Sequence, residues 1–151
     1  LRASIDAGEV TMGEVYTVLP FQNVLATFQL TGADVVAALE NGASQYEEAA
    51  GRFAQVAGLK YTVDPAAAAG SRISDVMVQK DGEWVAIDPA ATYGVATNNY
   101  MRGGGDGYEV FATKGQNAYD FGPDLAEVVA AYLGAQEGGY TPYVDGRITV
   151  K

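Results

Sequence analysis

The first stretch with chemical potential is Val-Leu-Pro-Phe-Gln-Asn, residues 18–23. Phe21 follows a proline and precedes two amides, in an expected turn. An exposed aromatic ring there would offer a stacking face for a planar ligand, and Asn23 could donate to and accept from a base edge. The alternative is that Phe21 packs into the core. Composition alone leaves both interpretations open.

The second stretch runs from residue 97 to residue 108 and contains four glycines. Glycine lets a backbone approach a ligand closely, because it has no Cβ and tolerates positive φ. A flexible surface loop is the alternative, yet a pure spacer would favour serine and glycine over Tyr100, Asp106 and Tyr108. We expect Asp106 to accept hydrogen bonds from sugar hydroxyls. The glycine spacing matches neither a P-loop nor a dinucleotide fingerprint.

Arginines accompany these stretches in an otherwise acidic chain. Arg2, Arg52 and Arg102 lie near candidate loops, which suits anion binding, although a solvated surface charge is the alternative for each one. The net charge of −10 argues against binding to a nucleic-acid polymer or an anionic membrane surface. No apolar run reaches the roughly 18 residues that a membrane span requires.

Catalytic groups are conspicuously few. The chain contains no histidine and no cysteine, which excludes a Ser-His-Asp triad, a thiol nucleophile and a thiolate or imidazole metal site. The carboxylates are dispersed, with no paired-carboxylate or EF-hand spacing. We therefore assign no catalytic residue, metal or cofactor to these 151 residues, and read them as a piece of a longer protein.

The elements that must position these groups follow from hydrophobic periodicity and turn signals. Thr31 and Asp34 begin a helix expected to reach about residue 50, and Asp81-Gly82 marks a hairpin. Residues 98–107 are expected to form a loop, 107–111 a strand, and 14–19 a helix end or a strand. The remaining expectations are a helix over 122–133 and strands over 24–30, 59–63, 72–79, 84–87, 92–97 and 147–150. This order predicts a single α+β domain, with a mixed sheet, short hairpins and two main helices.

Several motifs, taken together and in order, resemble the C-terminal domain of the 5′-nucleotidase family. They are Leu1-Arg2, Leu-Pro-Phe at 19–21, Gln-Leu-Thr-Gly at 29–32, Gly-Arg-Phe at 51–53, Thr-Asn-Asn-Tyr at 97–100, Gly-Gly-Asp-Gly-Tyr at 104–108 and Asp-Gly-Arg-Ile at 145–148. The resemblance covers essentially the whole chain. The family includes UDP-sugar hydrolases, 2′,3′-cyclic phosphodiesterases and a thiosulfohydrolase of sulfur oxidation.

The resemblance implies a periplasmic or extracellular enzyme in which this domain binds the nucleotide. A metallophosphatase domain, N-terminal to residues 1–151, would carry two divalent metal ions and the catalytic residues. The positions that match the family's substrate-binding residues are Phe21 and Tyr100 around the base, Asn23 and Gly51 near the base, Asp106 at the ribose and Arg2 at the phosphate. A non-catalytic binding module and the domain of a thiosulfohydrolase are the alternatives.

The sequence also departs from the family pattern. Gln22 replaces a common glycine and Tyr100 a common phenylalanine, and both changes bear on base preference. The Asn-Gly-Gly-Gly run that normally precedes Ile/Val-Arg does not precede Leu1-Arg2, so part of the phosphate site is expected to lie outside these residues.

Overall fold

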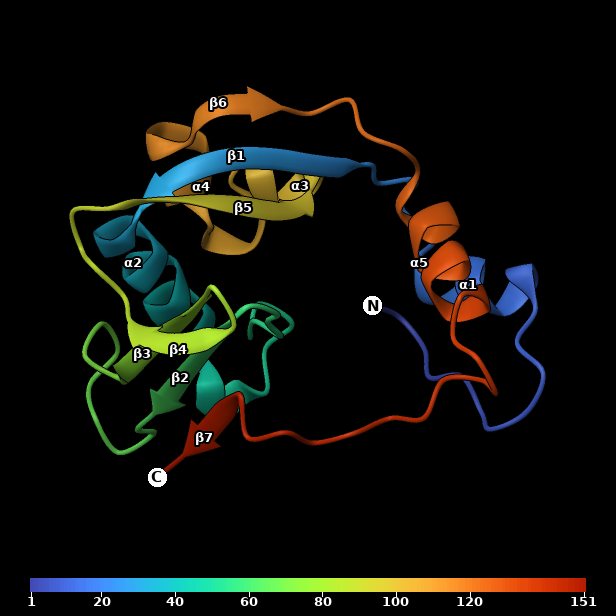
Figure 1. Cartoon of the computed structure of the whole chain (residues 1–151), viewed down its shortest axis with the longest axis horizontal. Helices are drawn as coiled ribbons and strands as arrows, with labels where there is room; N and C mark the ends of the chain where they lie inside the picture. Colours follow the sequence, from blue (N-terminus) through green and yellow to red (C-terminus); the bar gives the residue numbers. More distant parts are fainter.

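The computed structural model describes residues 1–151 and contains two β-sheets (Figure 1). The strands are β1 (Leu25–Thr31), β2 (Leu59–Val63), β3 (Ile73–Lys80), β4 (Glu83–Ala86), β5 (Thr92–Asn98), β6 (Gln116–Tyr119) and β7 (Ile148–Val150). The α-helices are α1 (Met12–Val18), α2 (Gly32–Ala43), α3 (Asn99–Arg102), α4 (Glu109–Lys114) and α5 (Leu125–Gly134). Short 3₁₀ turns, η1 and η2, cover Tyr46–Glu48 and Gly105–Gly107.

The sheets differ in their strand pairing. One has the order β5-β1-β6 with antiparallel neighbours, and the other has the order β4-β3-β2-β7. The second sheet is mixed, because β2 and β7 run parallel while its other pairs are antiparallel. Asp81 and Gly82 connect β3 to β4 with positive φ angles of 52° and 85°, as the hairpin signal predicts. The α+β prediction is confirmed, with two sheets in place of the one expected.

Helix α2 lies between the two sheets (Figure 1). On one side Ala38 packs with Phe28 and Leu30 of β1, and with Tyr108 and Phe111. On the other side a second core joins the helix to the mixed sheet; its buried members are Leu39, Ala43, Tyr61, Val63 and Val76. Alternate side chains of β1 are buried and half-exposed, so the strand presents one face to this helix.

Helix α2 begins as predicted but ends earlier. The Thr31 hydroxyl accepts from the Asp34 amide N–H at 3.2 Å, which caps the first turn. The helix stops at Ala43, not near residue 50, and the chain continues into η1. The Ser44 hydroxyl donates to the Asn41 carbonyl at 2.7 Å, and Ala49 adopts a left-handed φ of 49°. A side chain that satisfies the last carbonyls lets the helix end without a glycine.

The region after β5 was predicted incorrectly. The expected loop over 98–107 contains α3, which the Asn98 side chain caps by accepting from the Met101 amide N–H at 2.8 Å. The expected strand over 107–111 is the start of α4, because Phe111 turns inward onto Phe28 and Tyr108. Strand β6 has four exposed residues without an apolar alternation, so the sequence carried no signal for it.

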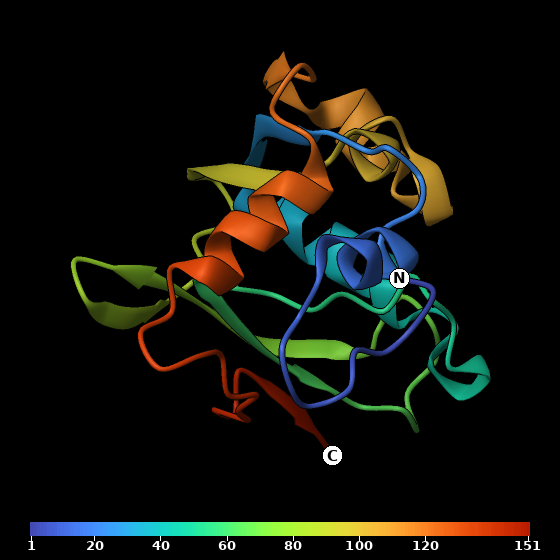
Figure 2. The same cartoon turned by 90° about the vertical axis from the view of Figure 1, so that its right-hand side faces the viewer.

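Helices α1 and α5 pack together at one end of the molecule (Figure 2). Thr11 and Glu14 form a reciprocal capping box at the start of α1, which settles the open choice for residues 14–19 in favour of a helix. The Asp124 carboxylate caps α5 by accepting from two amide N–H groups. None of the helices has the length and apolar composition needed to cross a membrane.

Candidate functional site

The two chemically active stretches are joined through the backbone at Val24 and Asn99. The Val24 amide donates to the Asn99 side-chain oxygen at 3.0 Å, and the Asn99 amide donates to the Val24 carbonyl at 2.9 Å. Phe21 lies three residues before the first of these anchors, and Tyr100 directly follows the second. Strand pairing between β1 and β5 therefore brings together two segments that are nearly 80 residues apart in sequence.

Both aromatic residues leave much of their surface open. Phe21 is 54% exposed and Tyr100 is 52% exposed, whereas Tyr108 in the same glycine-rich stretch is buried. Exposed aromatic rings are costly in water unless another surface covers them, so they suit a ligand or a partner. Neither ring belongs to the two buried core clusters, so the core alternative for Phe21 does not describe this structure.

The glycine-rich stretch positions Tyr100 and Asp106 relative to each other. The Tyr100 ring lies against Gly105 so closely that a Cβ there would be 2.4 Å from Cε1 of the ring. Asp106 has a left-handed φ of 54°, a conformation that few non-glycine residues adopt. The Tyr100 hydroxyl donates to Asp106 Oδ1 at 3.1 Å. The stretch is therefore an ordered turn that aims a carboxylate at the edge of an aromatic ring.

Behind this turn lies a set of supporting contacts. Asn41 of α2 donates from Nδ2 to the Asp106 carbonyl at 3.1 Å, and its Oδ1 is close to Gly107, where a Cβ would lie only 2.6 Å away. The Tyr108 hydroxyl donates to the Arg52 carbonyl at 2.6 Å. Burial, together with the negative charge of Asp106, raises the pKa of Tyr108 to about 12, so this donor keeps its proton.

Sequence reasoning did not single out Asn41. One signal was available: asparagine is a weak helix former, and Asn41 stands within the last turn of α2. Its side chain is used across space, on a residue 65 positions further along the chain. A periodicity argument sees only the helix, and so it misses this role.

Arg2 lies against Phe21, a contact that the sequence did not predict. Its guanidinium carbon lies 5.0 Å from the Phe21 ring centroid, within the range of a cation–π contact. The Arg2 amide donates to the Val18 carbonyl at 3.1 Å, which ties the start of the chain to α1. No carboxylate forms a salt bridge with Arg2. The guanidinium is thus beside the aromatic face and available to an anion.

Asn23 and Gly51 are placed less tightly. Asn23 is half-buried beside Phe21, and its backbone carbonyl accepts from the Leu125 amide N–H at 2.8 Å. Its side-chain amide makes no hydrogen bond within the chain. Gly51 is exposed in the turn after η1, with no atom within 4 Å of the position that a Cβ would take. Their roles in ligand binding remain predictions.

Arg102 is not an anion-binding residue of the exposed face. Its side chain is only 16% exposed, and Nε lies 3.5 Å from Asp120 Oδ1. The guanidinium also lies over the Phe28 ring, with 5.8 Å between its carbon and the ring centroid. Arg102 is therefore neither a solvated surface charge nor a ligand contact, because Asp120 of the same chain supplies its counter-charge.

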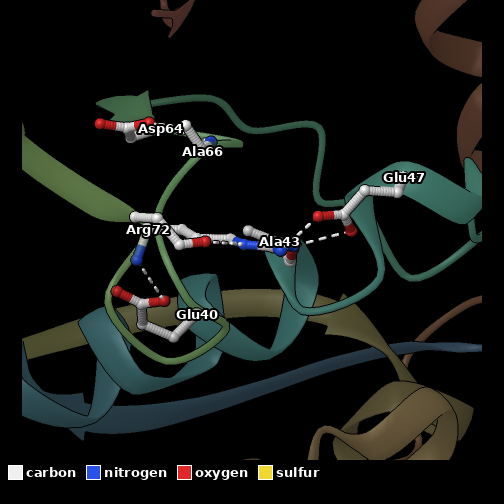
Figure 3. Close-up of polar contacts among 7 residues, drawn as sticks. Glu40, Ala43, Glu47, Asp64, Ala66 and Arg72 are labelled. Atoms are coloured by element: carbon white, nitrogen blue, oxygen red, sulfur yellow. Dashed lines mark hydrogen bonds and ion pairs between the residues drawn. The ribbon is translucent and has the colours of Figure 1, made fainter.

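Arg72 was not singled out from sequence, yet it is the one charged residue that the fold buries (Figure 3). Nη1 donates to the Ala43 carbonyl at 2.7 Å, Nε donates to the Ala67 carbonyl at 3.0 Å, and the guanidinium forms an ion pair with Glu47. That contact lowers the pKa of Glu47 below its usual range. Arg72 joins the end of α2 to the loop before β3.

The residues of the chain do not assemble a metal site. No three acidic side chains come close enough together to hold a metal ion, and histidine and cysteine are absent from the sequence. The exposed or half-buried groups of the two segments and of the start of the chain are instead aromatic rings, one carboxylate, an amide and one guanidinium, from Phe21, Tyr100, Asp106, Asn23 and Arg2. Such groups can bind a planar, hydroxylated anion, but they do not themselves activate water.

Comparison with known proteins places this arrangement in a family. Residues 1–113 match the model of the 5′-nucleotidase C-terminal domain. The trifunctional nucleotide phosphoesterase protein YfkN of Bacillus subtilis is 42% identical over 149 residues, which cover 98% of this chain and 10% of that protein. The 5′-nucleotidase precursor of Thermus thermophilus superposes with a TM-score of 0.91 at 44% identity, over 99% of this chain and 29% of that one.

A third relative catalyses a different reaction by its name. The sulfate thiohydrolase SoxB of Thermus thermophilus has a TM-score of 0.59 at 26% identity, over 89% of this chain and 23% of that one. The chain thus spans under a third of each of these three proteins. The matched family model and the 42% identity to YfkN show that the chain belongs to the 5′-nucleotidase C-terminal domain family.

Proposed function

We propose that this chain is the substrate-recognition domain of a metal-dependent nucleotide phosphohydrolase of the 5′-nucleotidase type. Two observations support the proposal, in a chain of this family. The segments that carry the exposed rings of Phe21 and Tyr100 are hydrogen-bonded to each other at Val24 and Asn99. Arg2 lies over the ring of Phe21, and Tyr100 donates to Asp106. The related proteins act on nucleotides by name, as in YfkN and the Thermus 5′-nucleotidase.

Each group on this face has a role that its chemistry supports. The rings of Phe21 and Tyr100 clamp the base, since stacking of a base on one aromatic side chain is worth about 1–3 kcal/mol. Asp106 accepts hydrogen bonds from the sugar hydroxyls, because a carboxylate has acceptors and no donors. Asn23 and Gly51 border the base. Arg2 binds the phosphate through charge-assisted hydrogen bonds.

The catalytic step belongs elsewhere in this proposal. The chain's own residues do not fit a metal ion, so no hydrolytic step is derived from them. We propose that an N-terminal metallophosphatase domain of the same protein holds two divalent ions and that this chain presents the phosphate to it. A periplasmic or extracellular location is also proposed, and it is supported by the family resemblance alone.

The likeness to SoxB favours a second candidate, in which the domain serves a thiosulfohydrolase. A third possibility is a binding module without an associated enzyme. The aromatic pair favours the nucleotide over these candidates, because a sulfur oxyanion offers no planar surface to stack on a ring.

Calorimetric titration of the chain with AMP, 2′,3′-dideoxy-AMP and thiosulfate tests the proposal. We expect AMP to bind, dideoxy-AMP to bind more weakly, and thiosulfate to give no heat that AMP can compete away. Asp106→Ala should weaken AMP binding more than about tenfold, since hydrogen bonds to a charged group contribute about 1.5–3 kcal/mol each. The same substitution should change dideoxy-AMP binding far less.

Thermal melting separates this role from a structural one. If Asp106→Ala lowers the melting temperature and weakens both nucleotides equally, Asp106 is a turn residue and not a sugar ligand. Specific binding of thiosulfate without binding of AMP would instead select the thiosulfohydrolase candidate.

A further inference from the structure

One hydrogen bond on the exposed face is already made before any ligand arrives. The Tyr100 hydroxyl donates to Asp106 Oδ1 at 3.1 Å. This oxygen belongs to the carboxylate that the proposed function assigns to the sugar. The donor belongs to the ring that the proposed function assigns to the base. A phenylalanine at position 100 would stack equally well and would leave this oxygen free.

The chemistry of a sugar diol makes this hydrogen bond consequential. A cis-diol binds a carboxylate most fully when each hydroxyl donates to a different oxygen. An ionised carboxylate oxygen has about two lone-pair sites, and the phenol takes one of those on Oδ1. A sugar hydroxyl that approaches Oδ1 therefore shares this oxygen with the phenol and gains less from the hydrogen bond. The other oxygen, Oδ2, has no partner within the chain, and it can accept from a single sugar hydroxyl.

The position of the carboxylate does not depend on the phenol alone. Asn41 Nδ2 donates to the Asp106 carbonyl at 3.1 Å. The backbone of Asp106 is also held in the left-handed region, between Gly105 and Gly107. Because these contacts fix the main chain, loss of the Tyr100 hydroxyl should free Oδ1 without displacing the turn.

We propose that the Tyr100 hydroxyl sets the sugar selectivity of this site, by occupying one oxygen of Asp106 and reducing the advantage of a ribose diol over a sugar with one hydroxyl. The site then binds ribonucleotides and 2′-deoxyribonucleotides with similar affinity. This inference rests on the proposed function. It assigns to position 100 an effect on the sugar, in addition to the effect on the base that the sequence suggests.

The test is the affinity ratio of AMP to 2′-deoxy-AMP, measured by calorimetry on the chain and on Tyr100→Phe. In the unsubstituted chain the ratio should lie within about threefold. In Tyr100→Phe it should rise by about tenfold or more, because the regained contact is a hydrogen bond from a sugar hydroxyl to a charged carboxylate. Tyr119→Phe is the matched control: Tyr119 is similarly exposed at 55%, and its hydroxyl has no protein partner.

The possible outcomes are distinct. A ratio that rises in Tyr100→Phe and not in Tyr119→Phe supports the inference. If AMP binds but its ratio to 2′-deoxy-AMP stays unchanged or falls in Tyr100→Phe, the hydroxyl orients Asp106 for the diol or does nothing, and the inference is overturned while the proposed function stands. If neither nucleotide binds the unsubstituted chain, the proposed function fails and this inference fails with it.

Discussion

The buried contacts around Arg72 and the exposed surface around Phe21 both contain an arginine, but only the first arginine has its polar partners within the chain. Arg72 is 7% exposed, and two backbone carbonyls and the Glu47 carboxylate surround its guanidinium. Arg2 is exposed, its guanidinium lies over the ring of Phe21, and it forms no salt bridge. The guanidinium of Arg72 has its hydrogen-bond partners within the chain, whereas the guanidinium of Arg2 has donors that are free to bind a ligand.

This difference separates a structural polar group from a recognition group. A buried guanidinium must have its donors satisfied, because an unpaired charge in the interior costs several kcal/mol. An exposed guanidinium meets that requirement with water and can exchange the water for a phosphate. The count of internal partners, not the residue type, therefore distinguishes the two roles.

The largest expected effect comes from Arg72→Met. The substitution leaves the Ala43 and Ala67 carbonyls without their donor, and it removes the ion pair with Glu47. We expect the free energy of unfolding to fall by about 2–4 kcal/mol, measured by urea denaturation. Arg2→Met is the matched control and should change stability by about 0.5 kcal/mol or less.

The comparison between the two arginines is sharpened if the same variants are tested for AMP binding. Arg2→Met should weaken AMP binding. Arg72→Met should not, when the titration is run well below the melting temperature of that variant. Equal losses of stability in the two variants would show that Arg2 is as important to the fold as Arg72, which contradicts the distinction between them.

How far the sequence predicts this molecule depends on the range of the signal. The hairpin at Asp81-Gly82 and the cap at Thr31 are local, and the structure has both where they were expected. The segment after Asn98 was predicted wrongly. Helix α3 has a local cap in the Asn98 side chain, whereas α4 is held in part by a contact with a distant strand. Phe111 is an example: the sequence predicts it in a strand, but it lies in α4 and packs against Phe28.

The same distinction applies to the polar residues. Motif resemblance selected Phe21, Tyr100 and Asp106, and the fold brings Tyr100 into contact with Asp106. Asn41 carries only the weak signal of a poor helix former in the last turn of α2, and nothing near Arg72 in the sequence marks its role. The partners of Arg72 lie up to 32 residues away, and that of Asn41 lies 65 away. Tertiary contacts of this kind leave no periodic trace.

The second effect in size concerns Phe21. Phe21→Ala should weaken AMP binding by about 5-fold to 150-fold, the value of one stacked ring, with little loss of stability. Tyr143→Ala is a matched control, because Arg147 lies over the Tyr143 ring at 5.1 Å just as Arg2 lies over Phe21 at 5.0 Å. Arg147, however, also binds Asp145 and the Val56 carbonyl, both at 2.8 Å.

The control variant Tyr143→Ala should leave AMP affinity unchanged. If both aromatic substitutions weaken AMP binding equally, the number of internal partners of the arginine does not distinguish the Phe21 ring from the Tyr143 ring.

A smaller effect is expected from Gly105→Ala. The added Cβ would lie 2.4–2.6 Å from three atoms of the Tyr100 ring, so the ring must move while the buried core stays intact. We expect a loss of AMP affinity of up to about tenfold, a part of the stacking energy. Gly134→Ala, where no atom lies within 4 Å of the new Cβ, is the control. Unchanged affinity in Gly105→Ala would show that the Tyr100 ring does not need its present position to bind.

The smallest effect is a pH dependence of the contact between Arg72 and Glu47. The hydrogen bond from Arg72 lowers the pKa of Glu47 below its ordinary value of 4.5, so the folded chain holds this carboxylate deprotonated at a pH where the unfolded chain begins to protonate it. The stability from this contact is therefore complete above about pH 4.5 and is lost as the pH falls through the folded-state pKa.

Glu47→Gln tests this pH dependence, because glutamine keeps an acceptor oxygen but does not titrate. The difference in unfolding free energy between the chain and this variant should shrink from neutral pH to about pH 3 in urea titrations. Glu14 and Asp145 also have lowered pKa values, but both proteins contain them and their contributions cancel in the difference. The effect stays small because Glu47 is largely open to solvent, which screens its charge. A difference that stays constant over the whole range would mean that hydrogen-bond geometry, which glutamine retains, holds Arg72 in place without help from the charge.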